Sequence, residues 1–262
     1  MNDEAMGHYF KGTGARVVGH RGSPRHAHEN TFESFDAAEA EGAEGWELDV
    51  RLTYDGEVVV FHDSEIVFQG RRMPIASLTM AELSEVRLGP SERPMAIPTL
   101  RDLFLRYGTG GRYLVEMKAG PTPRPGLLEH RVGELLARFR LLDKAMVLCF
   151  SADMLRRIKE QEPEVATCLN FDSTTYRPLG CLVPELPKGC DAIGPHVALA
   201  TDALLAEAKT ANLAVHVWTV NDPVFAAHLA TQGVASIITD VPAEIGPAVR
   251  AVTGRPAPLE IA

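Results

Sequence analysis

The sequence has few cysteines, no uninterrupted apolar run of 18 residues and no cluster of basic residues. Because a membrane-spanning helix needs such a run, we expect no membrane insertion. The formal net charge of −9, with no Lys/Arg-rich segment, argues against a nucleic-acid partner. The cysteines show no C-x-x-C spacing, so we interpret them as reduced buried thiols rather than zinc ligands or disulfide partners: Cys149, Cys168, Cys181 and Cys190.

The first twelve residues, MNDEAMGHYFKG, are polar and partly acidic, and they lack the apolar segment of a signal peptide. We therefore expect a cytoplasmic protein, with residues 1–14 as a flexible lead. The chain of 262 residues is 45% hydrophobic and 23% charged, which is typical of an ordinary globular protein. Its length suits one large α/β barrel or two smaller domains.

Short apolar runs alternate with helical patterns along most of the chain. We expect eight barrel strands, at residues 16–20, 46–50, 113–118, 146–150, 165–171, 191–194, 214–220 and 236–239. Strands that alternate with helices in this number predict a (β/α)₈ TIM barrel, formed by residues 1–262 as a single domain. The alternative is an open doubly wound sheet, which would carry fewer strands, and no G-x-G-x-x-G motif follows a strand here.

Two additions to the barrel are expected after its second strand. The first is a β-hairpin, and the second is a small helical excursion over the rim at residues 64–112. That excursion contains two helix starts, Thr79-x-x-Glu82 and Thr99-x-x-Asp102, and no clear strand.

The hairpin lies within residues 46–63, the stretch around which the chain is organised. Asp55 and Gly56 predict a two-residue type I′ turn, because this pair accepts the positive φ angles of that turn. A two-residue loop would place Asp49 opposite His62.

Side chains of a strand alternate between its two faces, so this register places Glu47, Asp49 and His62 on one face. The other face is apolar, with Leu48, Val50, Leu52, Val59 and Phe61. Carboxylates held close together raise one another's pKa unless a cation lies between them. A hard divalent ion that prefers oxygen ligands would satisfy them, although an ordinary solvated charged face is the plainer interpretation.

Polar side chains also follow the other early strands of the expected barrel. At the carboxyl ends of three neighbouring strands these are His20 and Arg21, Glu47 and Asp49, and Glu116 and Lys118, with His62 returning to the same rim. Three acids can hold one divalent ion, Arg and Lys can hold a phosphate, and two imidazoles can serve as base and acid. This combination suits displacement at phosphorus.

Several short motifs occur in order along nearly the whole chain: His20-Arg21-Gly22, Glu29-Asn30-Thr31, Glu47-x-Asp49, Asp55-Gly56, His62-Asp63, Glu116-x-Lys118, Trp218-Thr219-Val220-Asn221 and Ile238-Thr239-Asp240. In this order they resemble the glycerophosphodiester phosphodiesterase family. The resemblance implies a (β/α)₈ barrel that cleaves glycerophosphodiesters to glycerol 3-phosphate and an alcohol with the help of a divalent cation.

The resemblance also implies a role for each matching residue. It suggests Glu47, Asp49 and Glu116 as ligands of one divalent cation (Mg²⁺ or Ca²⁺, or else Mn²⁺), His20 and His62 as the acid and base pair, and Arg21 and Lys118 as phosphate contacts. Trp218 is suggested as a substrate-binding wall of the pocket, with core packing as the alternative. We interpret Asn30 as a helix cap and Asp240 as a turn residue.

The expected partner is a small-molecule glycerophosphodiester, and two other functions stay open. One is a lysophospholipase D-type phosphodiesterase acting on lysophospholipids, which a wide apolar groove over the rim would favour. The other is a noncatalytic barrel that only binds a phosphorylated ligand, which binding without turnover would favour. The residues do not specify the alcohol, the preferred ion, the acid and base assignment or the oligomeric state.

Overall fold

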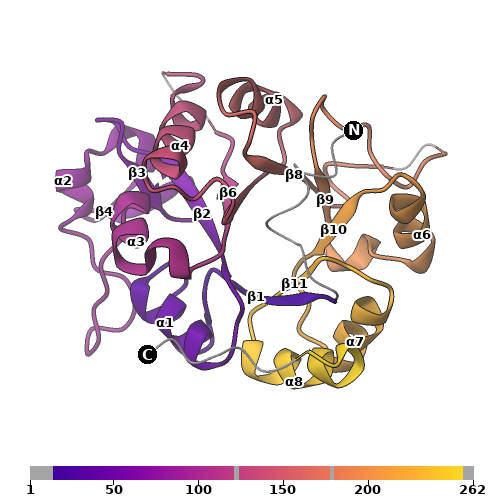
Figure 1. Cartoon of the computed structure of the whole chain (residues 1–262). Helices are drawn as coiled ribbons and strands as arrows, with labels where there is room; N and C mark the ends of the chain where they lie inside the picture. The colour runs from indigo at the N-terminus through magenta and orange to yellow at the C-terminus, as the bar shows by residue number, and fades with distance from the viewer. Residues whose placement is uncertain (1–13, 121–123, 178–179, 256–262) are drawn as a thin grey trace.

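The computed structural model describes residues 14–120, 124–177 and 180–255, so the predicted lead lies outside the described residues except for Gly14. Its eight parallel strands are β1 (Arg16–His20), β2 (Trp46–Leu52), β6 (Tyr113–Met117), β7 (Ala145–Cys149), β8 (Ala166–Phe171), β9 (Ala192–Pro195), β10 (Ala214–Val217) and β11 (Ser236–Thr239). They pair in chain order, and β1 pairs with both β2 and β11. The sheet is therefore closed, and the predicted TIM barrel is confirmed (Figure 1).

Helices surround this ring in Figure 1: α1 (Phe32–Ala40), α3 (Leu100–Tyr107), α4 (Leu127–Arg138), α5 (Ala152–Gln161), α6 (Asp202–Thr210), α7 (Pro223–Thr231) and α8 (Pro242–Thr253). Helix α7 begins after Asp222, whose carboxylate accepts from the backbone N–H of Phe225. The cap predicted at Asn30 is wrong, since the side chain that caps α1 is that of Thr31. Among the described residues, no helix is both long and apolar enough to cross a membrane.

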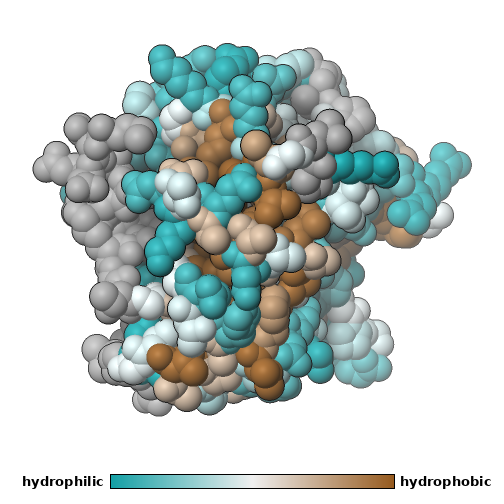
Figure 2. Space-filling model, turned by 90° about the vertical axis from the view of Figure 1, so that its right-hand side faces the viewer, coloured by the Kyte–Doolittle hydropathy of each residue, from teal (hydrophilic) through white to brown (hydrophobic). Residues whose placement is uncertain are grey.

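Side chains along each strand alternate between the barrel interior and the surrounding helices. The interior is filled by Val18, Leu114, Met146, Leu148, Cys168, Ala192 and Ile238. Two larger apolar clusters lie between the strands and the helices, one around β2, β6 and β7 and the other around β9, β10 and β11. Figure 2 shows the α6 side of the molecule, where hydrophobic residues lie in a band between hydrophilic ones.

The thiols of Cys149 and Cys168 are buried as predicted, whereas Cys181 is exposed.

The hairpin after β2 forms, but its register differs from the prediction by one residue. Strand β3 (Val58–Val60) pairs with β2 so that Val50 lies opposite Val60, and the Phe61 N–H donates to the Asp49 carbonyl. Asp49 therefore lies opposite Phe61 and not opposite His62. Val58 and Val60, rather than Val59, join the apolar face of β2.

The loop explains this shift. It has three residues instead of two, because the Thr53 N–H donates to the Glu57 carbonyl, and Gly56 has φ +89°. A three-residue loop with a left-handed glycine is a common hairpin connection. Asp55 holds it in place by accepting from the Thr53 hydroxyl at 2.6 Å and from the Met80 N–H at 3.1 Å.

The excursion over the rim contains a second hairpin, so the expectation of no strand there is wrong. Strands β4 (Glu65–Phe68) and β5 (Arg71–Pro74) are joined by Gln69 and Gly70, whose φ angles are both positive. This is the dihedral pattern of a type I′ turn. The short helices η1 (Ile75–Ser77), α2 (Met80–Leu83) and η2 (Gly108–Gly110) lie in the same region. A separate apolar cluster lies beneath it, formed by Val59, Ile66, Ile75, Leu78, Leu83, Leu88, Met95 and Ile97.

Candidate active site

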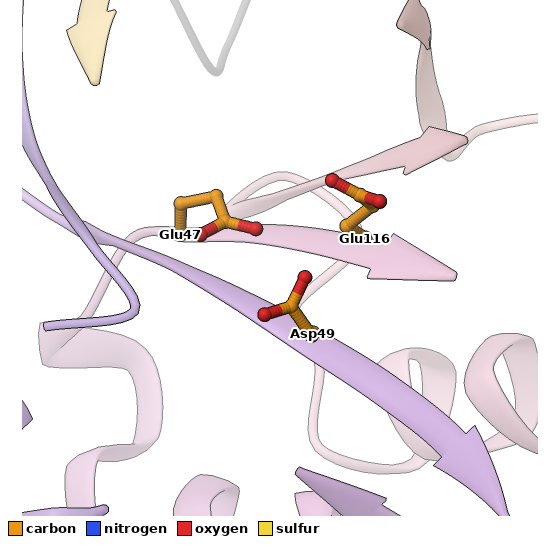
Figure 3. A group of neighbouring side chains, drawn as sticks. All are labelled: Glu47, Asp49 and Glu116. Atoms are coloured by element: carbon orange, nitrogen blue, oxygen red, sulfur yellow. The ribbon is translucent and has the colours of Figure 1, made fainter. Parts of the chain in front are cut away.

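Three carboxylates from two neighbouring strands meet inside the barrel near its carboxyl end. Glu47 and Asp49 lie two residues apart on β2, and Asp49 pairs in register with Glu116 on β6. All three residues are buried, and each offers an oxygen within 4.8 Å of the others. Figure 3 shows these side chains converging on one point. The structure thus brings together the three residues suggested as metal ligands.

Two cations lie against these acids. Lys118 Nζ is 2.9 Å from Asp49 Oδ1 and also contacts Glu116. Arg21 Nε is 3.1 Å from the other oxygen of Asp49. Burial would raise the pKa of Asp49, but the charges of Lys118, Arg21 and His62 hold it below its usual value. Asp49 is therefore ionised at neutral pH.

Glu47 is in a different electrostatic position. Burial raises its pKa well above the usual value, and the charges of Asp49 and Glu116 add to the effect. Its Oε2 accepts from the Arg21 N–H at 3.1 Å, but among the described residues its buried Oε1 has no hydrogen-bond partner. A buried oxygen without a partner is costly. A hard divalent cation would satisfy it, so the donor set fits such an ion.

Two asparagines, which the sequence analysis did not place in the site, hold the acids in position. Asn30 donates to Asp49 Oδ2 at 2.8 Å and accepts from the Asp49 N–H, while φ at Asn30 is +58°. Asn170 on β8 donates to Glu116 Oε2 at 3.2 Å. Asn170 is at an inward position near the carboxyl end of a barrel strand. This position in the strand pattern could have identified it as a site residue from the sequence.

The first histidine is held by an aspartate that was interpreted as a turn residue. His20 Nδ1 lies 2.7 Å from Asp240 Oδ1, and its Nε2 lies 3.9 Å from Glu47 Oε2. Burial would raise the pKa of Asp240, but hydrogen bonds from His20 and Asn221 lower it. An ionised carboxylate can only accept, so His20 carries its proton on Nδ1 and presents Nε2 to the carboxylate group.

The second histidine has a similar arrangement in a more open place. His62 Nδ1 lies 2.8 Å from Asp63 Oδ1, and the backbone carbonyl of His62 accepts from Arg51 Nε at 2.8 Å. The His62 side chain is 35% exposed, compared with 17% for His20. In both histidines an aspartate occupies Nδ1, which leaves Nε2 to exchange a proton.

Trp218 makes a different set of contacts. Its indole N–H donates to the Gly194 carbonyl at 2.8 Å, and its ring packs edge-on against Phe150 and His196. It also packs against the apolar interior of the barrel. These contacts agree with core packing at the end of β10 and leave its suggested role in substrate binding a prediction.

Comparison with known proteins identifies the family. Residues 20–244 match the model of the glycerophosphoryl diester phosphodiesterase family. The Bacillus subtilis protein YhdW, provisionally named a glycerophosphodiester phosphodiesterase, is 30% identical over 86% of this chain and 94% of its own length. The chain belongs to this family. It is accordingly a phosphodiesterase, as the resemblance implied.

Solved structures agree with the barrel. A provisionally named family member from Silicibacter pomeroyi superposes with a TM-score of 0.82 at 24% identity, over 96% of this chain and 97% of that chain. A phosphodiesterase from Oleispira antarctica, solved with the product sn-glycerol-3-phosphate, has a TM-score of 0.75 at 26% identity, over 89% and 96% of the two chains.

Proposed function

We propose that this phosphodiesterase hydrolyses glycerophosphodiesters to glycerol 3-phosphate and an alcohol, with one divalent cation and two histidines. The observation that carries the proposal is the convergence of three buried carboxylates with Lys118, Arg21 and the aspartate-paired His20 at one end of the barrel. The second aspartate-paired histidine, His62, acts electrostatically on the same acids and lowers the pKa of Asp49. The product bound by the Oleispira antarctica relative supports the glycerophosphodiester as the substrate class.

Glu47, Asp49 and Glu116 would hold the cation. When bound there, a divalent ion supplies positive charge that offsets the charge of the phosphate group and polarises the groups on phosphorus. Lys118 and Arg21 already touch these acids and carry donors suited to phosphate oxygens, Arg21 in a planar fork and Lys118 as a point charge. Their part is to bind and orient the diester.

The histidines move the protons. The Nε2 atom of one takes the proton of the attacking hydroxyl, which belongs either to water or to the adjacent glycerol group. As the new P–O bond forms and the bond to the alcohol breaks, the Nε2 atom of the other gives a proton to the departing oxygen. Asp240 and Asp63 keep the opposite ring nitrogens protonated and so hold both rings in the required tautomer.

An assay of glycerol 3-phosphate release from glycerophosphocholine tests this function directly. We expect release with added Mg²⁺, Ca²⁺ or Mn²⁺, its loss with a chelator, and its return when the ion is restored. His20→Ala and His62→Ala should each lower kcat by about 100-fold or more, the usual contribution of a general acid or base. Near-native turnover in both variants would refute the assignment. Binding of glycerophosphocholine without turnover would instead favour a noncatalytic barrel.

A further inference from the structure

The chain leaves the barrel sheet just before His62. Strand β3 ends at Val60, and the pairing with β2 continues for one more bond, from the Phe61 N–H to the Asp49 carbonyl at 2.9 Å. His62 is the next residue. Its ring partner, Asp63, has a side chain that is 66% exposed. The place of the His62 ring therefore depends on contacts other than those of the sheet ladder.

Arg51 on β2 supplies such a contact. Its Nε atom donates to the backbone carbonyl of His62 at 2.8 Å. Within the described part of the chain, the other hydrogen bond of His62 joins its ring to Asp63, the next residue in the sequence. A bond between neighbours in sequence moves with the loop that carries both of them, whereas Arg51 belongs to a barrel strand. Arg51 is thus the residue that ties His62 to the barrel.

The Arg51 side chain is itself confined at the rim. Side chains alternate along β2, so Arg51 points to the same side of the strand as Asp49. It is half-buried, and its Nη1 atom would lie 3.5 Å from a Cβ added to Gly120 in the chain after β6. Burial lowers the pKa of Arg51, while the charges of Asp49, Asp63 and Glu116 oppose this effect and favour the cation. A planar, confined guanidinium is a stiff donor.

We propose that Arg51 is a positioning residue that holds His62 over the rim of the barrel through the hydrogen bond from its Nε atom to the His62 carbonyl. The proposal rests on the proposed function, in which Nε2 of His62 moves a proton. A proton-transfer group must lie within hydrogen-bond reach of the reacting oxygen. Displacement of His62 should therefore lower kcat more than it changes KM. Arg51 acts through His62 and needs no contact with the diester.

Two substitutions of matched length isolate the donor. Gln places its amide nitrogen as many bonds from Cα as the Nε atom of Arg, so Arg51→Gln keeps the donor and removes the charge. Met places a methyl group there and offers no donor. We expect Arg51→Met to lower kcat for glycerophosphocholine by about 10-fold or more, up to the loss in His62→Ala. Arg51→Gln should stay within about 3-fold of native kcat.

A third substitution separates the bond from the charge. Arg51→Lys keeps the charge but moves the donor one bond further from Cα, so it should lower kcat more than Arg51→Gln does. The reverse order would assign the effect to charge and would overturn the proposal, even if Arg51→Met failed to fold. The matched control is Arg87→Met. Arg87 also donates to a backbone carbonyl of the rim excursion, that of Val86 at 2.8 Å, and its loss should leave kcat native.

A double-mutant cycle with His62 tests whether Arg51 acts through that residue. Arg51→Met should lower kcat in the otherwise native protein but by less than about 2-fold in the His62→Ala background, because the group that it positions is then absent. A merely structural loss would lower kcat equally in both backgrounds, and that result would overturn the proposal. A native kcat for Arg51→Met would overturn it as well and would leave the phosphodiesterase function standing.

Crystal structures of the variants decide the inference without turnover. If the wild-type protein hydrolysed no diester, or if His62→Ala kept native kcat, the proposed function or its histidine assignment would fail. The position of His62 in Arg51→Met and Arg51→Gln would then decide the role of Arg51. A ring displaced in the Met variant and native in the Gln variant would support it, and an unmoved ring in the Met variant would overturn it.

Discussion

Replacing Asp240 with Asn tests whether this carboxylate sets the state of His20. In the wild-type protein Asp240 Oδ1 lies 2.7 Å from Nδ1 of His20, and Asn221 donates to the other carboxylate oxygen at 2.7 Å. Asp240→Asn keeps the size of the side chain but can present an N–H group to Nδ1. The imidazole proton would then move to Nε2, and that nitrogen could no longer accept a proton.

The size of the effect follows from the kind of hydrogen bond that is lost. A hydrogen bond to a charged group contributes about 1.5–3 kcal/mol. If it orients His20 fully in the transition state, kcat should fall by about 10- to 150-fold. KM should change less, because the phosphate contacts proposed for Arg21 and Lys118 remain.

Steady-state release of glycerol 3-phosphate from glycerophosphocholine, measured across pH, gives both constants. Asp222→Asn is a matched control, since Asp222 also follows a barrel strand but only caps α7. Asn is an equally good cap, so this control should retain native kcat. If Asp240→Asn also retained native kcat and the native pH profile, Asp240 would not be a positioning residue for His20.

Three further predictions concern metal binding and stability. Glu47→Gln should abolish the rise in Tm that Mn²⁺ gives the wild-type protein, and an unchanged rise would exclude Glu47 as a ligand. Asn170→Ala leaves Oε2 of Glu116 without its donor and should lower the free energy of unfolding in urea by about 1–3 kcal/mol; no loss would show that this bond is dispensable. Burial lowers the pKa of His216 to about 3. The neutral His216 side chain therefore contributes fully to stability above pH ~6.5. As pH falls below that value the free energy of unfolding decreases, by up to ~1.4 kcal/mol per pH unit, because the unfolded chain binds the proton first. His216→Asn should weaken the dependence of the free energy of unfolding on pH, measured by urea titrations between pH 7 and 4. An unaltered dependence would contradict the reasoning.

The barrel and its acidic group could be predicted because they depend on local patterns. Each strand is a short apolar run, and a spacing of two placed Glu47 and Asp49 on one face of β2 regardless of the hairpin register. Parallel neighbours then aligned Asp49 with Glu116. This inference needed only the order of the strands and the alternation of side chains between the two faces of each strand.

The hairpin register could not be predicted in the same way, because loop length depends on contacts outside the loop. Asp55 accepts from the Met80 N–H, at a residue 25 positions along the chain. Meanwhile Gln69 and Gly70 form the two-residue turn expected at Asp55 and Gly56. A favourable dipeptide is therefore a weaker signal than the contacts that hold the loop.

The supporting residues were missed for a related reason. Asn is a common residue at helix caps, and Asp is common in turns. Asn30 and Asp240 nevertheless each bond to a site residue far along the chain. The Asp240 contact with His20 spans 220 residues and forms only because β1 and β11 are neighbours in the closed ring. Closure of the barrel, rather than any motif, makes this pair.

From the balance of charge we expect the same acids to serve both ion and substrate. With neutral histidines, Glu47, Asp49 and Glu116 against Arg21 and Lys118 leave one net negative charge when all three acids are ionised. A divalent cation would change this to one positive charge, which a phosphodiester of charge −1 would neutralise. The raised pKa of Glu47 follows from burial and from the same excess of negative charge, and a bound cation would lower it. Glu47→Gln would remove the excess and with it much of the attraction for the ion, so metal affinity and diester binding should weaken together.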